Sequence, residues 1–152
     1  MEEYKKQYPD FNELVINDIQ SYEFSIESNK LKVIQNNQYE SIILTDNGIL
    51  GNKESFSYSE LVKLRSYEAY TLINYNGKEK KIKVTQTNEI QSGQSSVFYD
   101  DVKERQLIFP NLEAGAKKVY NYQTEIVDPF LLHRFIFGGA LPIKNSTLEI
   151  KT

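Results

Sequence analysis

Apolar and polar residues alternate along much of the chain with a period of two. Tyr22, Phe24 and Ile26 alternate with glutamate and serine, and the segment from Val119 to Thr124 alternates in the same way. Because successive side chains of a β-strand point to opposite faces, each such run predicts a strand with one buried face. Applied to the whole chain, the pattern predicts roughly ten to twelve short strands.

Short polar segments separate these runs and predict turns. Ser28-Asn29-Lys30 and Asn36-Asn37 divide the first three runs, and Asp46-Asn47-Gly48 closes the strand that begins at Tyr39. Asn76-Gly77 is the strongest hairpin signal, because a type I′ turn needs positive φ at both central residues, which Asn tolerates and Gly adopts freely. We therefore expect a tight hairpin there that fixes the register of its two strands.

The pattern is less regular in two other places. Phe56 and Tyr58 predict a strand, and residues 61–64 predict one helical turn after it. Phe130–Phe137 is the most apolar run, and it continues the strand-like last third of the chain until Gly138-Gly139 breaks it.

Composition agrees with a fold made of strands. Val, Ile, Thr, Tyr and Phe number 49 of the 152 residues, whereas Ala numbers 4. The length fits one domain, with a polar lead-in at residues 1–8 and the domain itself at 9–152. The sequence thus predicts an all-β antiparallel sandwich with no helix longer than about three turns.

Charge and hydropathy narrow the range of partners. The net charge is −3, which argues against nucleic-acid binding. The densest basic run, Lys78–Lys83, alternates like a strand, and edge lysines of this kind prevent edge-to-edge pairing of sheets. No apolar run approaches the roughly 20 residues of a membrane helix, so we expect no membrane insertion. The first residues do not resemble a signal peptide.

Residue types remove most catalytic chemistry. The chain has no Cys, which excludes a thiol nucleophile, and the single His excludes a multi-histidine metal site within one chain. His133 could act as a general base, but a base needs a nucleophile and an orienting acid, and the sequence designates neither. We therefore expect no catalytic residue, no cofactor, no hydrolase or transferase activity, and a binding function that survives His133→Ala.

Other polar patterns are less specific. Asp100, Asp101, Glu104 and Glu113 could bind Ca²⁺, but the EF-hand spacing is absent, so a solvated loop is favoured. Asn145-Ser146-Thr147 fits the N-glycosylation triplet, and we expect it to be unmodified. A carboxylate pair could hydrolyse glycosides, yet among 21 acidic residues none is distinguished by its spacing.

Aromatic residues are a further candidate for ligand binding. Most of the 11 Tyr occupy alternating strand positions, where core packing is the default. Tyr120 and Tyr122 lie on the same side of one predicted strand, which makes them the best candidates for an aromatic patch that contacts a sugar or a peptide.

Seven segments, taken in order, resemble one known family. The most specific is Phe98–Gly115, which ends in a Phe-Pro, Leu-Glu and Gly pattern and is followed by a strand. Together the segments resemble domain of unknown function 3857 over about residues 8 to 150. They are Tyr8-Pro9-Asp10, Thr45–Gly48, Asn74–Lys78, Phe98–Gly115, Val119–Thr124, Pro129–Leu132 and Phe137–Ile143.

The resemblance implies an accessory role. Domain 3857 is an all-β domain of bacterial proteins that often precedes a transglutaminase-like domain, and the Cys-His-Asp chemistry belongs to that neighbour. It also implies the cell envelope or periplasm, if the parent chain carries a signal peptide. Because this chain stops at Lys151-Thr152, where such a neighbour would follow, we expect an excised N-terminal domain or a stand-alone relative.

The leading hypothesis is therefore a non-catalytic module that positions a following transglutaminase-like domain or recognises its substrate. One alternative is an independent envelope domain that binds a glycan or a peptide. The other is an acid-pair hydrolase.

Overall fold

Two β-sheets make up the fold in the computed structural model, which describes residues 1–91 and 101–152. Three short helical segments accompany them: α1 (Glu2–Gln7), η1 (Asp46–Gly51) and η2 (Pro129–Leu131). The strands found in the described residues are β1 (Glu13–Glu27), β2 (Lys30–Ile43), β3 (Lys53–Tyr58), β4 (Val62–Tyr75), β5 (Lys78–Lys83), β6 (Gln86–Gln91), β7 (Lys103–Ile108), β8 (Lys117–Ile126) and β9 (Ile143–Lys151).

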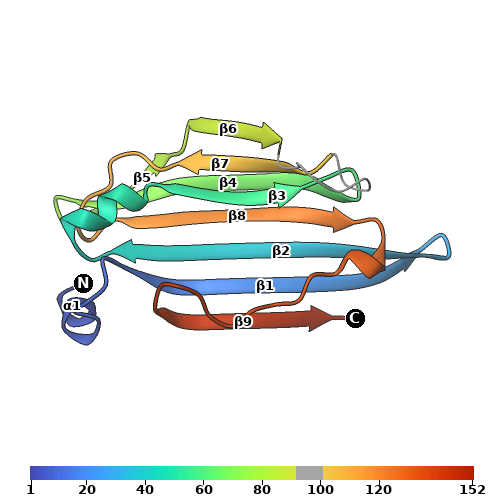
Figure 1. Ribbon diagram of the computed structural model, residues 1–152, viewed down its shortest axis with the longest axis horizontal. Helices are drawn as coiled ribbons and strands as arrows, with labels where there is room; N and C mark the ends of the chain where they lie inside the picture. The colour runs from blue at the N-terminus through green and yellow to red at the C-terminus, as the bar shows by residue number, and fades with distance from the viewer. Residues whose placement is uncertain (92–100) are drawn as a thin grey trace.

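The large sheet has six strands in the order β5-β4-β8-β2-β1-β9, and the small sheet has three in the order β3-β7-β6. The small sheet lies over β4 and β8, which we call the closed half of the large sheet together with β5 (Figure 1). The remaining strands, β2, β1 and β9, form the open half. The all-β sandwich predicted from the sequence is confirmed, and the β1–β9 pair adds a parallel pairing that the pattern did not predict.

The strands are fewer and longer than predicted. Nine occur in the described part of the chain, and β1 has 15 residues. The apolar run at Leu14–Ile16 and the predicted run at Tyr22 form one strand, because Asn17 and Asp18 between them pair with Glu40 and Tyr39 of β2. The turn predicted at Asn36-Asn37 is wrong, since both residues lie inside β2 and pair with Ser21 and Gln20 of β1. Register with two neighbouring strands overrides the local turn preference of Asn.

Two hairpins were predicted correctly and two local features were not. Ser28 and Asn29 have φ of 51° and 62°, and Asn76 and Gly77 have φ of 52° and 77°, as type I′ turns require. By contrast, Asp46 begins the short 3₁₀ segment η1 rather than a tight turn. The helical turn predicted at residues 61–64 is wrong, because β4 begins at Val62 and contains a bulge between Leu64 and Ser66.

The main core lies between the small sheet and the closed half. Its buried members include Phe56 of β3, Leu107 of β7 and Tyr120 of β8, with Phe109 just beyond β7. Inward positions of both sheets supply these side chains, as the period-two pattern requires. The core therefore fixes the small sheet against β4 and β8.

A buried ion cluster holds the same region together. Lys118 of β8 is 1% exposed, and its Nζ lies 2.8 Å from a carboxylate oxygen of Glu13 and donates to a carboxylate oxygen of Glu54. The Nζ also donates to the carbonyl oxygen of Gly51 at 2.8 Å. Burial raises the pKa of Glu54, and the neighbouring Lys118 acts in the opposite direction. The cluster joins β8 of the closed half to β3 of the small sheet and to the first residue of β1.

The lead-in helix is part of the packed domain. Tyr4 of α1 and the adjacent Tyr8 pack on a separate cluster formed by Leu14, Ile42 and Leu44. Within the described residues, no helix is both long and apolar enough to cross a membrane.

Residues 127–142, which connect β8 to β9 and which we call the strap, cover part of the open half. Leu131 packs against Tyr22 and Val33, and the carbonyl oxygen of Pro142 accepts from the N–H of Val15 at 2.9 Å. The strand-like assignment of Phe130–Phe137 is wrong, because this run forms η2 and irregular chain. Much of its apolar surface remains in solvent: Phe130 is 97% exposed, Ile136 67% and Phe137 66%.

Candidate binding cleft

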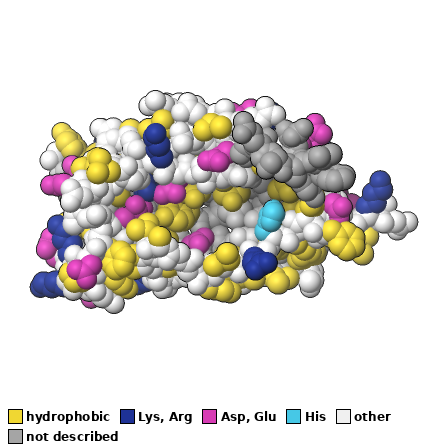
Figure 2. All heavy atoms as spheres, viewed as in Figure 1, with side chains coloured by type: hydrophobic (Ala, Val, Ile, Leu, Met, Phe, Trp, Pro, Cys, Tyr) yellow, Lys and Arg dark blue, Asp and Glu magenta, His cyan; other side chains and the backbone are white. Residues whose placement is uncertain are grey.

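An open cleft lies on the inner face of the large sheet, between β3 and the strap. It consists of two adjoining pockets of about 290 Å³ and 260 Å³, which share Gln20 of β1 and Tyr122 of β8. Ser57, Tyr58 and neighbouring residues form one wall. The cleft is visible in Figure 2 as a hollow with the cyan His133 side chain at its rim.

Inward-facing positions of three strands build the cleft floor. In the sheet register, Gln35 pairs with both Tyr22 and Thr124, and Asn37 pairs with both Gln20 and Tyr122. Residues paired in this way point to the same face. The alternation that supplies apolar side chains to the main core therefore supplies polar side chains here.

Side-chain hydrogen bonds run along this floor and end in an unpaired donor. Thr124 Oγ1 donates to Gln35 Oε1 at 3.4 Å, and Gln35 Nε2 donates to Asn37 Oδ1 at 3.2 Å. The amide nitrogen of Asn37 is buried and has no hydrogen-bond partner among the described residues. A buried donor of this kind is costly unless a ligand or water satisfies it.

Asp18 places a carboxylate at the end of the cleft beside Tyr39 and Arg134. Burial raises the pKa of Asp18 above its ordinary value. In contrast to Glu13 and Glu54, which share Lys118, Asp18 has no hydrogen bond or ion pair within the described part of the chain. The site thus contains a partly desolvated acid without a compensating cation.

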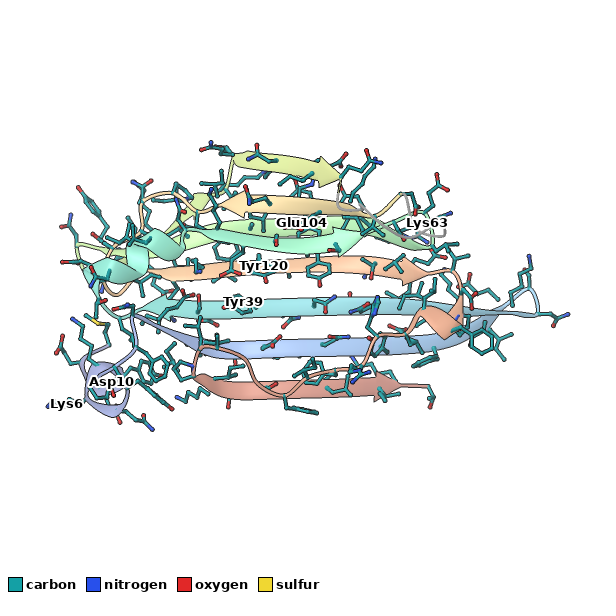
Figure 3. The ribbon with its side chains drawn as sticks, viewed as in Figure 1. Lys6, Asp10, Tyr39, Lys63, Glu104 and Tyr120 are labelled. Atoms are coloured by element: carbon teal, nitrogen blue, oxygen red, sulfur yellow. The ribbon has the colours of Figure 1, made fainter. Side chains whose placement is uncertain are left out.

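Tyrosine rings contribute to both the core and the cleft. Tyr39 and Tyr120 lie side by side on β2 and β8 with ring centroids 4.9 Å apart (Figure 3). Tyr122 stacks on Phe56 at 4.2 Å, and burial raises the pKa of Tyr122 to about 12. The predicted aromatic pair, Tyr120 and Tyr122, therefore lines the cleft while its ring faces pack against other rings.

A hydrogen bond to a main-chain atom of the strap connects this wall of the cleft to the sheet. The Tyr22 hydroxyl accepts from Gln20 Nε2 and donates to the carbonyl oxygen of His133 at 3.4 Å. The side chains of His133, Arg134 and Ile136 line the two pockets. His133, for which the sequence designates neither a nucleophile nor an orienting acid, thus stands on the wall of the cleft.

The other predicted sites lie elsewhere. Asp101 accepts from the N–H of Glu60 at 2.7 Å, whereas Asp100 lies outside the described residues. Glu104 is on β7 and Glu113 follows the opposite end of that strand, so the structure does not bring these acids together. In the described ranges, no group of three His, Asp or Glu side chains is placed to hold a metal ion.

The N-glycosylation triplet also lies outside the cleft. Asn145 is in β9 and donates to Asn17 Oδ1 of β1 at 3.2 Å. The triplet is therefore part of a paired strand rather than a loop.

Sequence reasoning missed most of the cleft floor. Asp18, Gln20 and Asn37 share their face with buried aromatic or aliphatic residues of the same strands. Polar residues on the apolar face of a strand were the available signal, and Gln35, which continues the Leu31–Val33 face, shows it most clearly.

A second, charged pocket of about 450 Å³ lies on the far side of Tyr58. The Arg105 guanidinium donates to Glu89 and to the Tyr58 hydroxyl, both at 3.1 Å. Arg105 and Glu89 thus form an ion pair in this pocket, whereas Asp18 in the cleft has no ion pair among the described residues.

The fold and the cleft define a two-sheet, all-β domain with a polar groove on its inner face. The chain belongs to the family Domain of Unknown Function DUF3857, which matches residues 29–152. No curated protein matches the chain.

A solved structure shares the fold. It is a protein from Parabacteroides distasonis ATCC 8503 described as a “putative protease”, with a TM-score of 0.62 and 13% sequence identity. The match covers 76% of the present chain and 23% of that protein. At this identity the likeness concerns the fold alone, and the chain spans about a quarter of the length of the protein it resembles.

Proposed function

We propose that the chain is a non-catalytic binding module, and that its inner-face cleft recognises the substrate of a transglutaminase-like domain that follows it in the parent protein. The observation that carries the proposal is the cleft floor, where Asp18 and the Asn37 amide nitrogen lack partners among the described residues. Unpaired polar groups weaken a fold, so a ligand that satisfies them explains why they face the cleft.

The chemistry of the cleft favours binding over catalysis. Its floor presents side-chain amides, hydroxyls and one carboxylate, which are groups that orient a polar ligand. His133 stands on the wall, and its hydrogen bond to the sheet is made by its carbonyl oxygen rather than by its imidazole. General-base catalysis needs that ring to contact a nucleophile and an orienting acid.

The accessory role draws on the family and on the solved relative. DUF3857 membership supports a transglutaminase-like neighbour, because the sequence resemblance implies that arrangement. In the Parabacteroides protein, the shared fold occupies a minor part of a longer chain. The same resemblance supports a place in the bacterial cell envelope.

An independent envelope domain that binds a glycan or a peptide is the second candidate. The cleft favours it as much as it favours an accessory module, because the groove is formed within this chain. The coding sequence after the codon for Thr152 separates the two. A transglutaminase-like domain there supports the accessory role, and a stop codon supports the independent domain.

Binding itself is tested with matched variants. Pools of random hexapeptides and of bacterial oligosaccharides are offered to the wild-type chain, to Gln20→Ala in the cleft, and to Gln123→Ala on the opposite face of the large sheet. We expect retention of one pool that Gln20→Ala abolishes and Gln123→Ala preserves. Equal retention by all three chains, or none by any, would refute the cleft as the binding site. Turnover of a peptide or oligosaccharide that His133→Ala abolishes would refute the non-catalytic role.

A further inference from the structure

We infer that the cleft accepts an extended polypeptide, which binds as an additional strand on the free edge of β3. The inference rests on the proposed binding function and names the ligand class. The small sheet has three strands and the large sheet six, so no strand of the described residues covers the inner face beyond β3. Figure 1 shows β8 and β2 between β3 and the strap without a covering strand, and the two pockets of the cleft lie there.

The main chain of β3 presents hydrogen-bonding groups to this space. The N–H of Phe109 donates to the carbonyl oxygen of Asn52 at 2.8 Å, which makes Asn52 and Phe109 a hydrogen-bonded pair. Main-chain direction alternates along an antiparallel strand, so residues 54, 56 and 58 face β7, and residues 53, 55 and 57 face the free edge.

Ser55 and Ser57 are the central residues of that free edge. Both are exposed, and no described strand pairs with this side of β3. Ser57 lines the larger of the two adjoining cleft pockets. Together the two serines offer two N–H donors and two carbonyl acceptors in the geometry that an added strand uses.

The floor completes a site suited to a peptide. An added strand of about six residues would match the length of β3, roughly 20 Å, and its inward side chains would face Gln20 and Asn37. Side-chain amides pair well with the polar groups of peptides. We therefore expect small or polar side chains at every second position of the bound segment.

The aromatic rings favour a peptide over a glycan. A sugar is commonly bound against an open ring face, but Tyr122 stacks on Phe56 at 4.2 Å and Tyr39 stacks on Tyr120 at 4.9 Å. The Arg105 guanidinium lies 5.9 Å from the Tyr58 ring centroid. Ring faces in this region are thus largely occupied by neighbouring side chains.

The test begins with selection of binders from a random hexapeptide library on the wild-type chain. Each selected peptide is resynthesised with N-methyl groups on the odd amides or on the even amides. In an added strand, only alternate amides bond to β3. We therefore expect methylation of one set of amides, odd or even, to weaken binding by about tenfold or more, and methylation of the other set to have little effect.

The protein side is tested with Ser57→Pro, which removes an edge N–H without breaking the β3–β7 ladder, and Ser57→Ala, which keeps it. We expect the proline variant alone to lose binding. Amide hydrogen exchange gives a second measurement that needs no variant. The Ser55 and Ser57 amides should exchange rapidly in the free chain and slowly with bound peptide, while the Phe56 amide is protected in both states.

Three other outcomes would contradict strand addition, the peptide ligand or the binding function. Selected peptides that bind equally well with either methylation phase would overturn strand addition and leave the binding function standing. Binding of oligosaccharides but not hexapeptides would overturn the peptide assignment alone. Failure of both pools would count against the inference and against the proposed function.

Discussion

The two halves of the large sheet belong to one hydrogen-bonded sheet but use their inward positions differently. In the closed half these positions carry Tyr120 and Ala69 against Leu107 of the small sheet, and the one buried cation, Lys118, has two carboxylate partners among the described residues. In the open half, Asp18 and the Asn37 amide nitrogen have no partner in the described ranges. Lys118 of the closed half is paired within the fold, whereas Asp18 and Asn37 of the open half are the groups that the proposed ligand would pair.

We expect the largest loss of stability from a substitution in the closed half. Lys118→Ala leaves the Glu13 and Glu54 carboxylates buried without their cation, and we expect a loss of about 3–5 kcal/mol in the free energy of unfolding. Urea unfolding measures it, with Lys117→Ala as the control. Lys117 is 30% exposed and pairs with Glu40, so its removal should cost less than about 1 kcal/mol.

A triple variant removes the charges of the same ion cluster. Lys118→Met combined with Glu13→Gln and Glu54→Gln removes all the charges, and it should recover part of the stability that Lys118→Ala loses. Equal stability of Lys118→Ala and Lys117→Ala would show that the cluster does not hold the closed half.

We expect a smaller loss of stability from a substitution at the edge of the closed half. Gly77 has φ of 77° in the β4–β5 hairpin, and a Cβ at this position meets no atom within 4 Å. The cost of Gly77→Val is therefore one of backbone conformation, about 1–3 kcal/mol. Urea unfolding should show a lower midpoint for Gly77→Val and a smaller change for Gly77→Asn, because Asn tolerates the left-handed region. An unchanged midpoint for Gly77→Val would contradict the hairpin.

In the open half, by contrast, we expect a substitution to stabilise the fold. The folded-state pKa of Asp18 is raised above its ordinary value of 3.8 by burial, so the folded chain retains this proton to higher pH than the unfolded chain. Asp18 therefore contributes stability at low pH, where it is protonated. This contribution is lost as the pH rises through its folded-state pKa. We expect Asp18→Asn to stabilise the fold at pH 7 and to have little effect at pH 3.

Thermal unfolding at the two pH values measures the Asp18 effect. Glu149→Gln on β9 is a suitable control, because that carboxylate is 48% exposed. A loss of stability in Asp18→Asn at pH 7 would show that Asp18 supports the fold rather than the site.

The smallest effect is expected at the strap. His133→Ala removes an exposed side chain and leaves the carbonyl oxygen that Tyr22 contacts, so the free energy of unfolding should change by less than about 0.5 kcal/mol. Tyr22→Phe, which removes the hydroxyl that holds the strap, is the comparison and should loosen the strap more. A larger stability loss in His133→Ala than in Tyr22→Phe would place the strap anchor in the imidazole.

Local chemistry explains which parts of the fold could be predicted. Asn76-Gly77 specifies its own hairpin, and the Tyr22–Ile26 alternation specifies a strand, because both depend on neighbours in sequence. Asn36-Asn37 misled the prediction because pairing with β1 and β8 outweighs turn preference. The run Phe130–Phe137 misled it because strong hydrophobicity did not lead to burial in a sheet.

The cleft could not be predicted because it exists only in the assembled fold. Gln20, Asn37 and Ser57 are far apart in sequence and belong to three strands of two sheets. Strand order brings the first two together, and the docking of the small sheet places the third beside them. The sequence offered a partial signal, since Tyr122 was already a candidate for ligand contact.

The claim that the cleft is the binding site of this domain is tested most directly by mapping amide chemical shifts while ligand is added. A ¹⁵N-labelled chain is titrated with the best-retained member of the peptide or oligosaccharide pools. We predict that the perturbed amides cluster at Gln20, Gln35, Ser57 and His133, around the cleft. Perturbations confined to the outer face of the large sheet, for example at Gln123 and Asn36, would contradict it.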